Sequence, residues 1–235
     1  STETSQRTYM TQSLYLLRHA YSFANENPAI LHRTANMSVG LTDIGIRQAK
    51  EAALKILDLA KELQAQGHVL KVWNSPYQRT RHTADIVKEV LASENIFYLK
   101  EESIYLGERQ LGLIDDCANH LQTHSHEQTH YQLYKKENKD FFVRPPLGES
   151  YYDVAIRADF FLKNYIEKES TFEDKKIVHL LVSHGGCIKA LCMMQAGWTY
   201  EKCSSTQNPA NASITKITDK EVDMEWFIPK TRSFA

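Results

Sequence analysis

The 235-residue chain contains only four cysteines, and none has the C-x-x-C spacing of zinc sites and redox motifs. This content is too low for a disulfide-stabilised small domain, so we expect reduced thiols and a cytoplasmic location. Long apolar runs are also missing, since no stretch approaches the roughly 20 residues that cross a bilayer. Residues 1–13 are polar, lack the apolar core of a secretory signal, and are expected to form a flexible arm.

An excess of either charge is likewise absent. The chain has 28 lysines and arginines against 29 aspartates and glutamates, and its formal net charge is -1. Such a balance provides no overall basic field for nucleic acid or an anionic membrane, so neither is expected as a partner. The length suits one large α/β domain, and no internal repeat or low-complexity linker divides it. We therefore expect one domain over residues 14–235.

Apolar runs that suit strands alternate along the chain with segments of helical periodicity. This alternation predicts an α/β fold, a three-layer sandwich whose largely parallel central sheet has helices on both faces. The expected strands are Leu14–Leu17, Val69–Trp73, Ile96–Leu99 and Ile177–Val182, followed by a closing hairpin at Asn211–Thr218 and Glu221–Ile228. The expected helices follow Thr42, begin at Ser75-Pro76 and at Glu149-Ser150, and span about Cys187 to Gln195.

Charged and polar side chains follow four of these strands. Arg18 and His19 follow the first, Arg79 the second, Glu108 the third, and His184 with two glycines the fourth. Each has an ordinary structural explanation when taken alone, such as a solvated carboxylate for Glu108. Because parallel strands end at the same edge of a sheet, we expect these groups to converge. Arginines and a glycine-rich helix N-terminus together suit a doubly charged oxyanion.

Six segments also carry short motifs, in the order "LLRHAYSFAN", "LTDIGIRQA", "NSPYQRTRHTA", "LGERQLG", "FFVRPPLGESYYDVAIR" and "LVSHGGCIKAL". These motifs and their order resemble the histidine phosphatase, or phosphoglycerate mutase-like, superfamily over residues 14 to about 217. One position departs from the family pattern, because Ala20 stands where glycine is usual. We expect a backbone conformation there that alanine tolerates.

The resemblance implies a role for each charged group. His19 would be the nucleophile that forms a phosphohistidine, and Glu108 would be the acid and then the base. Arg18, Arg79 and His184 would hold the phosphoryl oxygens, with no metal or other cofactor. The two arginines should disfavour the imidazolium form of His19. The candidates for substrate binding are Ser22, Asn25, Arg109 and Gly185; structural pairing stays an alternative for Arg109, as it does for Arg144.

A segment at about 109–147 corresponds to the place where the resembling family builds its substrate-specific cap. It contains His120, His124, His126 and His130, whose i, i+4 spacing could put two metal ligands on one helix face. No further ligands complete a tetrahedral set, so we interpret the segment as a polar lid. Nearby, Arg157 is expected to form an ion pair and Tyr151 can line the pocket.

The function implied by the resemblance is hydrolysis of a small phosphomonoester through a phosphohistidine. The alternative is a phosphoglycerate-type mutase that returns the phosphoryl group to bound product. The family's mutases carry a longer segment rich in proline and arginine before the last histidine, which this chain lacks. A third alternative, a non-catalytic phosphate-binding module, fits less well because the catalytic set is complete.

Overall fold

A central sheet of seven strands organises the protein, which we describe from a computed structural model for residues 13–32, 34–112, 125–137 and 140–232. The strand order is β3-β2-β5-β1-β6-β7, and the short β4 pairs with β5. The parallel strands are β1 (Ser13–Arg18), β2 (Val69–Asn74), β3 (Tyr98–Glu102) and β5 (Lys175–Ser183). The antiparallel strands are β4 (Thr171–Phe172), β6 (Ile214–Thr218) and β7 (Glu221–Phe227).

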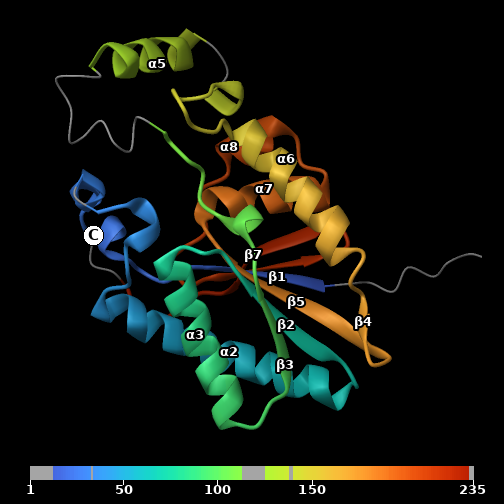
Figure 1. Ribbon diagram of the computed structural model, residues 1–235. Coiled ribbons are helices and arrows are strands. Elements are labelled where there is room, and N and C mark those ends of the chain that lie inside the picture. Colours follow the sequence, from blue (N-terminus) through green and yellow to red (C-terminus); the bar gives the residue numbers. More distant parts are fainter. Residues whose placement is uncertain (1–12, 33, 113–124, 138–139, 233–235) are drawn as a thin grey trace, which may run out of the picture.

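Helices cover both faces of this sheet, as Figure 1 shows. One face packs against α2 (Asp43–Ala65) and α3 (Gln78–Ser93), and the other against α6 (Tyr151–Phe161) and α7 (Gly185–Ala196). Side chains alternate between the faces along each strand. In β1, Tyr15 and Leu17 join the core beneath α2 and α3, whereas Leu14 and Leu16 join the core beneath α6 and α7. The predicted three-layer α/β sandwich is therefore confirmed.

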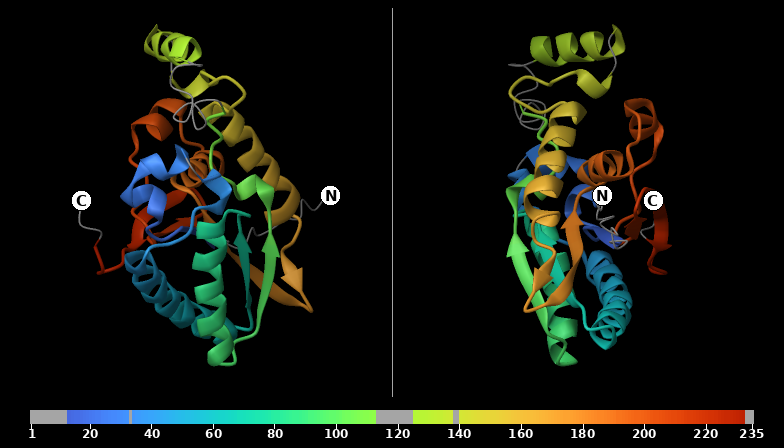
Figure 2. Two further views of the ribbon diagram at one scale, coloured as in Figure 1. Left: turned by 60° about the vertical axis from the view of Figure 1, so that its left-hand side comes forward. Right: turned by 90° about the vertical axis from the view of Figure 1, so that its right-hand side faces the viewer.

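Shorter elements lie between these strands and helices in the chain. They are the helices α1 (Phe23–Glu26), α5 (Ser125–Glu137) and α8 (Tyr200–Ser205), the 3-10 turns Pro28–His32, Asn36–Ser38, Ile104–Leu106 and Asp140–Phe142, and the π-helical turn Leu162–Ile166. Helix α5 lies at one end of the molecule, outside the three layers (Figures 1 and 2). Within the described ranges, none of the helices combines the length and apolarity that a membrane crossing requires.

Thr42 and Ser150 begin helices as predicted, and a glycine ends a third helix. Thr42 caps α2, where its Oγ1 accepts a hydrogen bond from the Gly45 amide at 3.1 Å. Ser150 caps α6 by accepting from the Asp153 amide, also at 3.1 Å. Gly197 ends α7 with a φ of 68°, a left-handed conformation that glycine adopts without strain.

Three of the sequence-based boundaries that differ from the structure have a cause that its hydrogen bonds show. Helix α3 begins at Gln78 rather than at Ser75-Pro76, because the Ser75 hydroxyl contacts His184 instead of capping a helix. The third strand spans Tyr98–Glu102 rather than Ile96–Leu99, since the Ile96 amide still donates to the Leu91 carbonyl of the preceding helix. Ser13 belongs to β1, where it pairs with Thr218, and the rest of the expected arm lies outside the described residues.

The fold generates a prediction at Gly45, in the first turn of α2. A Cβ atom at this position would lie 2.0 Å from the backbone oxygen of Tyr21, so alanine cannot enter without moving the helix or the loop before α1. We expect Gly45→Ala to lower the free energy of unfolding by roughly 2 kcal/mol or more, although alanine is the better helix former. Denaturant unfolding measures the change.

Gly40→Ala is the matched control, because its Cβ would come no closer than 3.5 Å to another atom, on the Gln78 side chain. This variant should stay within about 1 kcal/mol of the parent protein. Equal stabilities of the two variants would contradict the close approach at Tyr21.

Candidate active site

Arg18 and His19 lie at the carboxyl end of β1, and the neighbouring strands fix their backbone. The Arg18 amide donates to the Ser213 carbonyl at 3.1 Å, and the His19 amide donates to the Ser183 carbonyl at 2.9 Å. This anchoring between β5 and the residues before β6 holds both side chains at the edge where parallel strands end. The edge is the one that the sequence predicted for ligand binding.

The ring of His19 is held in one tautomer. Its Nδ1 lies 2.8 Å from the carbonyl oxygen of Ala20, and a carbonyl can only accept, so Nδ1 carries the proton. Nε2 of the neutral ring is then unprotonated. Ala20 is not among the residues with positive φ, and its amide donates to Thr83 Oγ1 at 3.1 Å. The expected tolerance of alanine at this position is confirmed.

Backbone carbonyls help to anchor the two arginines. Arg18 Nη1 donates to the Pro209 carbonyl at 2.6 Å, and Arg79 Nη1 donates to the Asn36 carbonyl at 2.8 Å. The Arg79 guanidinium also lies over the Tyr77 ring, 4.8 Å from its centroid. These contacts hold both guanidinium groups beside the cavity that they line.

The same two arginines keep the nearby histidines neutral. Burial, followed by the charges of Arg79 and Arg18, holds the pKa of His19 well below its usual value. The pKa of His184 is also well below its usual value, chiefly through burial and then through Arg79 and the neighbouring His19. The neutral form that a nucleophilic His19 needs is therefore the favoured one, as the sequence predicted.

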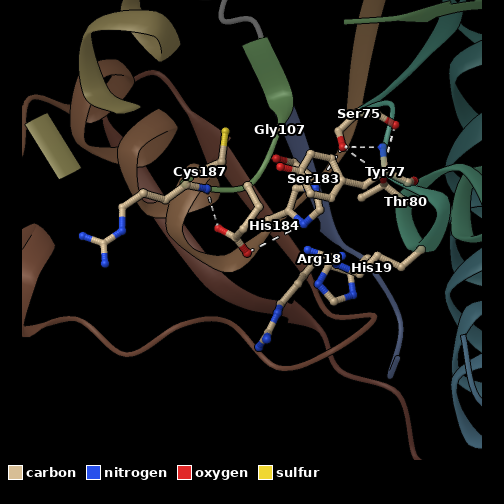
Figure 3. A network of polar contacts seen from close by, with 12 residues as sticks. Arg18, His19, Ser75, Tyr77, Thr80, Gly107, Ser183, His184 and Cys187 are labelled. Carbon is tan, nitrogen blue, oxygen red and sulfur yellow. Dashed lines mark hydrogen bonds and ion pairs between the residues drawn. The ribbon is translucent and has the colours of Figure 1, made fainter. Parts of the chain in front are cut away.

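His184 lies directly behind His19 at the N-terminus of α7, with ring centroids 5.2 Å apart (Figure 3). Its Nε2 is 2.8 Å from the Ser75 hydroxyl, and the edge of Tyr77 packs against its ring. The Ser75 hydroxyl can donate to Nε2, which would put the proton of the neutral ring on Nδ1. Nδ1 lies 3.7 Å from Glu108 Oε2.

Glu108 lies just beyond the 3-10 turn that follows β3, and its side chain is 27% exposed. Oε1 accepts a hydrogen bond from the Arg109 amide at 2.9 Å, while Oε2 faces His184. A carboxyl that is both ordered and reachable by water can donate and accept protons at the same place.

One cavity of about 270 Å³ brings most of the candidate residues together. Arg18, His19, Arg79 and Glu108 line it, as do the substrate-binding candidates Ser22, Asn25 and Arg109 and the expected Tyr151. His184 is fully buried behind this wall rather than in it. Gly185 is not among the lining residues and packs against Asn208, whereas the neighbouring Gly186 lines the cavity.

Unsatisfied donors collect around this cavity. Arg18 Nε, Arg109 Nη1 and His184 Nδ1 are buried nitrogen atoms without a hydrogen-bond partner in the described part of the chain. Buried polar groups without partners are rare and costly in folded proteins, so a cluster of them needs an explanation. An oxyanion with several acceptor oxygens would satisfy such a cluster.

Asn25 is ordered by three hydrogen bonds to the same side-chain oxygen. Its Oδ1 accepts from the Ser22 amide at 3.1 Å, the Ser22 hydroxyl at 2.9 Å and Asn211 Nδ2 at 3.2 Å. Asn211 Nδ2 also donates to the His19 carbonyl at 3.1 Å. Ser22 and Asn25 therefore connect the cavity wall to the backbone of the candidate nucleophile.

Sequence reasoning missed Asn36 and Asn208, which line the cavity from loops far apart in the chain. Asn36 contributes its carbonyl to Arg79, a role that any residue type could fill. Asn208 directly precedes Pro209, whose carbonyl holds Arg18. Neither contribution has a signal in residue type or spacing.

The remaining sequence expectations fall on α5 and α6. Arg157 forms the expected ion pair, with Glu149 at 2.9 Å, and Arg144 pairs with Asp153 rather than reaching the cavity. His130 is exposed on α5, and the side chains of His120, His124 and His126 lie outside the described residues. Where the structure is described, no group of three or more histidine, cysteine, aspartate or glutamate side chains could hold a metal ion.

Comparison with known proteins identifies the family. The model of the histidine phosphatase superfamily (branch 1) matches residues 14–226. The chain belongs to this superfamily. The Arabidopsis thaliana phosphoglycerate mutase-like protein AT74 is 24% identical over 211 residues, which are 87% of this chain and 64% of AT74. The chain thus spans less than two-thirds of that relative's length.

Two solved structures share the histidine phosphatase fold with this chain. Mycobacterial hydrolase 1 is 23% identical, with a TM-score of 0.64 over 89% of this chain and 92% of the other. A mycobacterial glucosyl-3-phosphoglycerate phosphatase is also 23% identical, with a TM-score of 0.63 over 88% and 90%. Such low identities establish a common fold only. Membership of the superfamily supports a phosphatase or mutase activity and identifies no substrate.

The buried histidines generate a prediction for stability. Burial lowers the pKa of His179 to about 4, and the pKa values of His19 and His184 are lower than usual for the same first reason. Unfolded histidines titrate near 6.5, so below that pH the unfolded chain binds more protons than the folded protein. The free energy of unfolding should fall as the pH drops from about 6.5 to 5, by up to about 1.4 kcal/mol per pH unit for each histidine.

Denaturant unfolding across this pH range measures the slope. His19→Asn removes one of the three groups and should give a shallower decline than the parent protein. An unchanged slope in this variant would contradict a neutral His19 in the folded state.

Proposed function

We propose that the protein hydrolyses a small phosphomonoester through a phosphohistidine formed on His19. The observation that carries this proposal is the hydrogen bond from Nδ1 to the Ala20 carbonyl. It leaves Nε2 with a lone pair in a cavity of about 270 Å³, beside the buried Arg79 and the partly buried Arg18. A neutral, oriented imidazole next to a phosphate-binding cluster is the requirement for nucleophilic catalysis at phosphorus.

In the first step, the Nε2 lone pair of His19 forms a bond to phosphorus and the bond to the ester oxygen breaks. The departing oxygen takes a proton from the Glu108 carboxyl group. Arg18 and Arg79 hold the phosphoryl oxygens while charge spreads over them, and the unpartnered Nδ1 of His184 supplies a further donor. Positioned cations supply most of the rate enhancement in such transfers, so the proposal requires no metal ion.

In the second step, water attacks the phosphohistidine and the phosphorus–nitrogen bond breaks. The Glu108 carboxylate accepts the proton from water, and inorganic phosphate leaves with His19 again neutral. Because the Glu108 side chain is 27% exposed, water can reach the carboxylate. This access supports hydrolysis over a mutase reaction, which must protect the phosphohistidine from water until the product takes the phosphoryl group back.

A trapping experiment tests the nucleophile. Rapid acid-free quenching of the protein with a radiolabelled phosphomonoester should capture phosphate on the protein that is stable to base and labile to acid. His19→Ala should form none and should lose at least about 100-fold in turnover, because no neighbouring group replaces the lone pair. The circular dichroism spectrum of the variant controls for its folding.

Label on His19→Ala would show that another residue is the nucleophile. Transfer of the label to an added alcohol instead of water would indicate a mutase.

A second experiment tests the acid. Phosphohistidine formation is measured in single turnovers with an alkyl phosphate, whose leaving group needs protonation, and with nitrophenyl phosphate, whose leaving group does not. Glu108→Gln should slow the alkyl reaction by roughly 100-fold, about 2.7 kcal/mol in the barrier, and the aryl reaction much less.

Arg79→Ala is the matched control, because Arg79 contacts the phosphoryl group that both esters share. It should slow both reactions alike. If Glu108→Gln also slowed both equally, Glu108 would not be the acid.

A further inference from the structure

Arg157 reaches from α6 to the segment that carries Glu108, and it binds only the backbone of that segment. Nη1 donates to the Tyr105 carbonyl at 2.6 Å, and Nη2 donates to the Gly107 carbonyl at 2.9 Å and to the Glu108 carbonyl at 3.2 Å. One guanidinium therefore bridges three carbonyl groups around the proposed acid. The planar fork of arginine can do this, whereas the point charge of lysine cannot.

Glu149 completes this arrangement from the other side of the guanidinium. Its Oε1 accepts from Arg157 Nε at 2.9 Å, and its Oε2 accepts from Arg157 Nη2 at 3.2 Å and from the Gln110 amide at 3.0 Å. The Glu149 amide in turn donates to the Gln110 carbonyl at 2.8 Å. The backbone of residues 105–110 is thus tied to the start of α6 on both sides of Glu108.

The Glu108 side chain has little else to orient it. Its carboxylate accepts one hydrogen bond, from the adjacent Arg109 amide, and its other oxygen lies 3.7 Å from His184. The direction of the carboxylate is therefore set largely by the backbone that Arg157 holds. Arg157 does not belong to the described lining of the cavity, and its guanidinium is committed to these carbonyls and to Glu149.

We propose that Arg157, oriented by Glu149, is a positioning residue that aims Glu108 at the leaving oxygen. This inference rests on the proposed function, because it assigns Arg157 a role only if Glu108 is the acid. Misplacing a catalytic group by about 1 Å can cost roughly 100-fold in rate. Loss of the bridge should therefore resemble a weaker form of the loss of Glu108 itself.

The test is Arg157→Lys, which keeps the charge and most of the stem but cannot bridge three carbonyls. In single turnovers, phosphohistidine formation from an alkyl phosphate should slow by roughly 10-fold or more, and formation from nitrophenyl phosphate by less than about threefold. The dissociation constant for inorganic phosphate should change less than about twofold, because Arg18 and Arg79 are untouched. Introduced into Glu108→Gln, the same substitution should add little further loss, since both changes remove one function.

Arg144→Lys is the matched control, because Arg144 forms its ion pair with Asp153 on the same helix but contacts none of residues 105–110. It should leave the rate of phosphohistidine formation from both esters unchanged. Glu149→Gln is a second variant in case Arg157→Lys does not fold. It should also slow the reaction of the alkyl ester more than that of the aryl ester, by a smaller factor than Arg157→Lys.

Two results would overturn the inference. The first is that Arg157→Lys slows phosphohistidine formation from both esters equally. The second is that the rate losses of Arg157→Lys and Glu108→Gln are fully additive in the double variant. Either would assign Arg157 a structural role alone. The proposed function fails separately, if Glu108→Gln itself shows no preference for the alkyl ester or if His19→Ala still becomes labelled.

Discussion

The site depends on one constraint: a buried arginine, Arg79, and a partly buried one, Arg18, lie at the edge of the sheet beside a histidine that must stay neutral. Arg79 is 4% exposed and His19 is 3% exposed, so water screens their interaction weakly. Burial and then the two cations hold the pKa of His19 well below its usual value, and the Ala20 carbonyl fixes the remaining proton on Nδ1. The same charges that would bind a phosphoryl group thus add to the effect of burial in keeping the lone pair of His19 free.

Burial of cations would ordinarily call for carboxylate partners, but a carboxylate would also neutralise the charge that a phosphate needs. Backbone carbonyls meet part of this need, from Pro209 for Arg18 and from Asn36 for Arg79. Carbonyl dipoles orient a guanidinium and satisfy part of its hydrogen-bonding capacity without an opposing net charge. These carbonyls come from segments distant in sequence, so the geometry of the site depends on the tertiary fold.

The difference between contacts made by side chains and contacts made by backbone groups also explains how far the sequence predicted the structure. Apolar runs such as Leu14–Leu17 predicted the strands of the sheet, because burial on two faces leaves a direct pattern in residue type. The residues with distinctive chemistry, such as His19 and Glu108, were found because they follow strands in the sequence and lie within short motifs. Contributions through the backbone, as at Asn36, leave no such pattern. Ser75 misled the prediction of α3 because a hydroxyl suits both a helix cap and a histidine partner, and only the tertiary contact with His184 decides between them.

The two carboxylates of this region show why contacts, rather than exposure, distinguish their roles. The side chains of Glu108 and Glu149 are almost equally exposed, at 27% and 24%. Both oxygens of Glu149 accept hydrogen bonds from Arg157, and one also accepts from the Gln110 amide, so this carboxylate is committed to Arg157 and to the backbone. Glu108 accepts a single backbone hydrogen bond on one oxygen and presents the other near His184. A general acid needs a fixed backbone and an uncommitted oxygen, so these contacts support the proposed acid role of Glu108, whose backbone Glu149 helps to fix through Arg157.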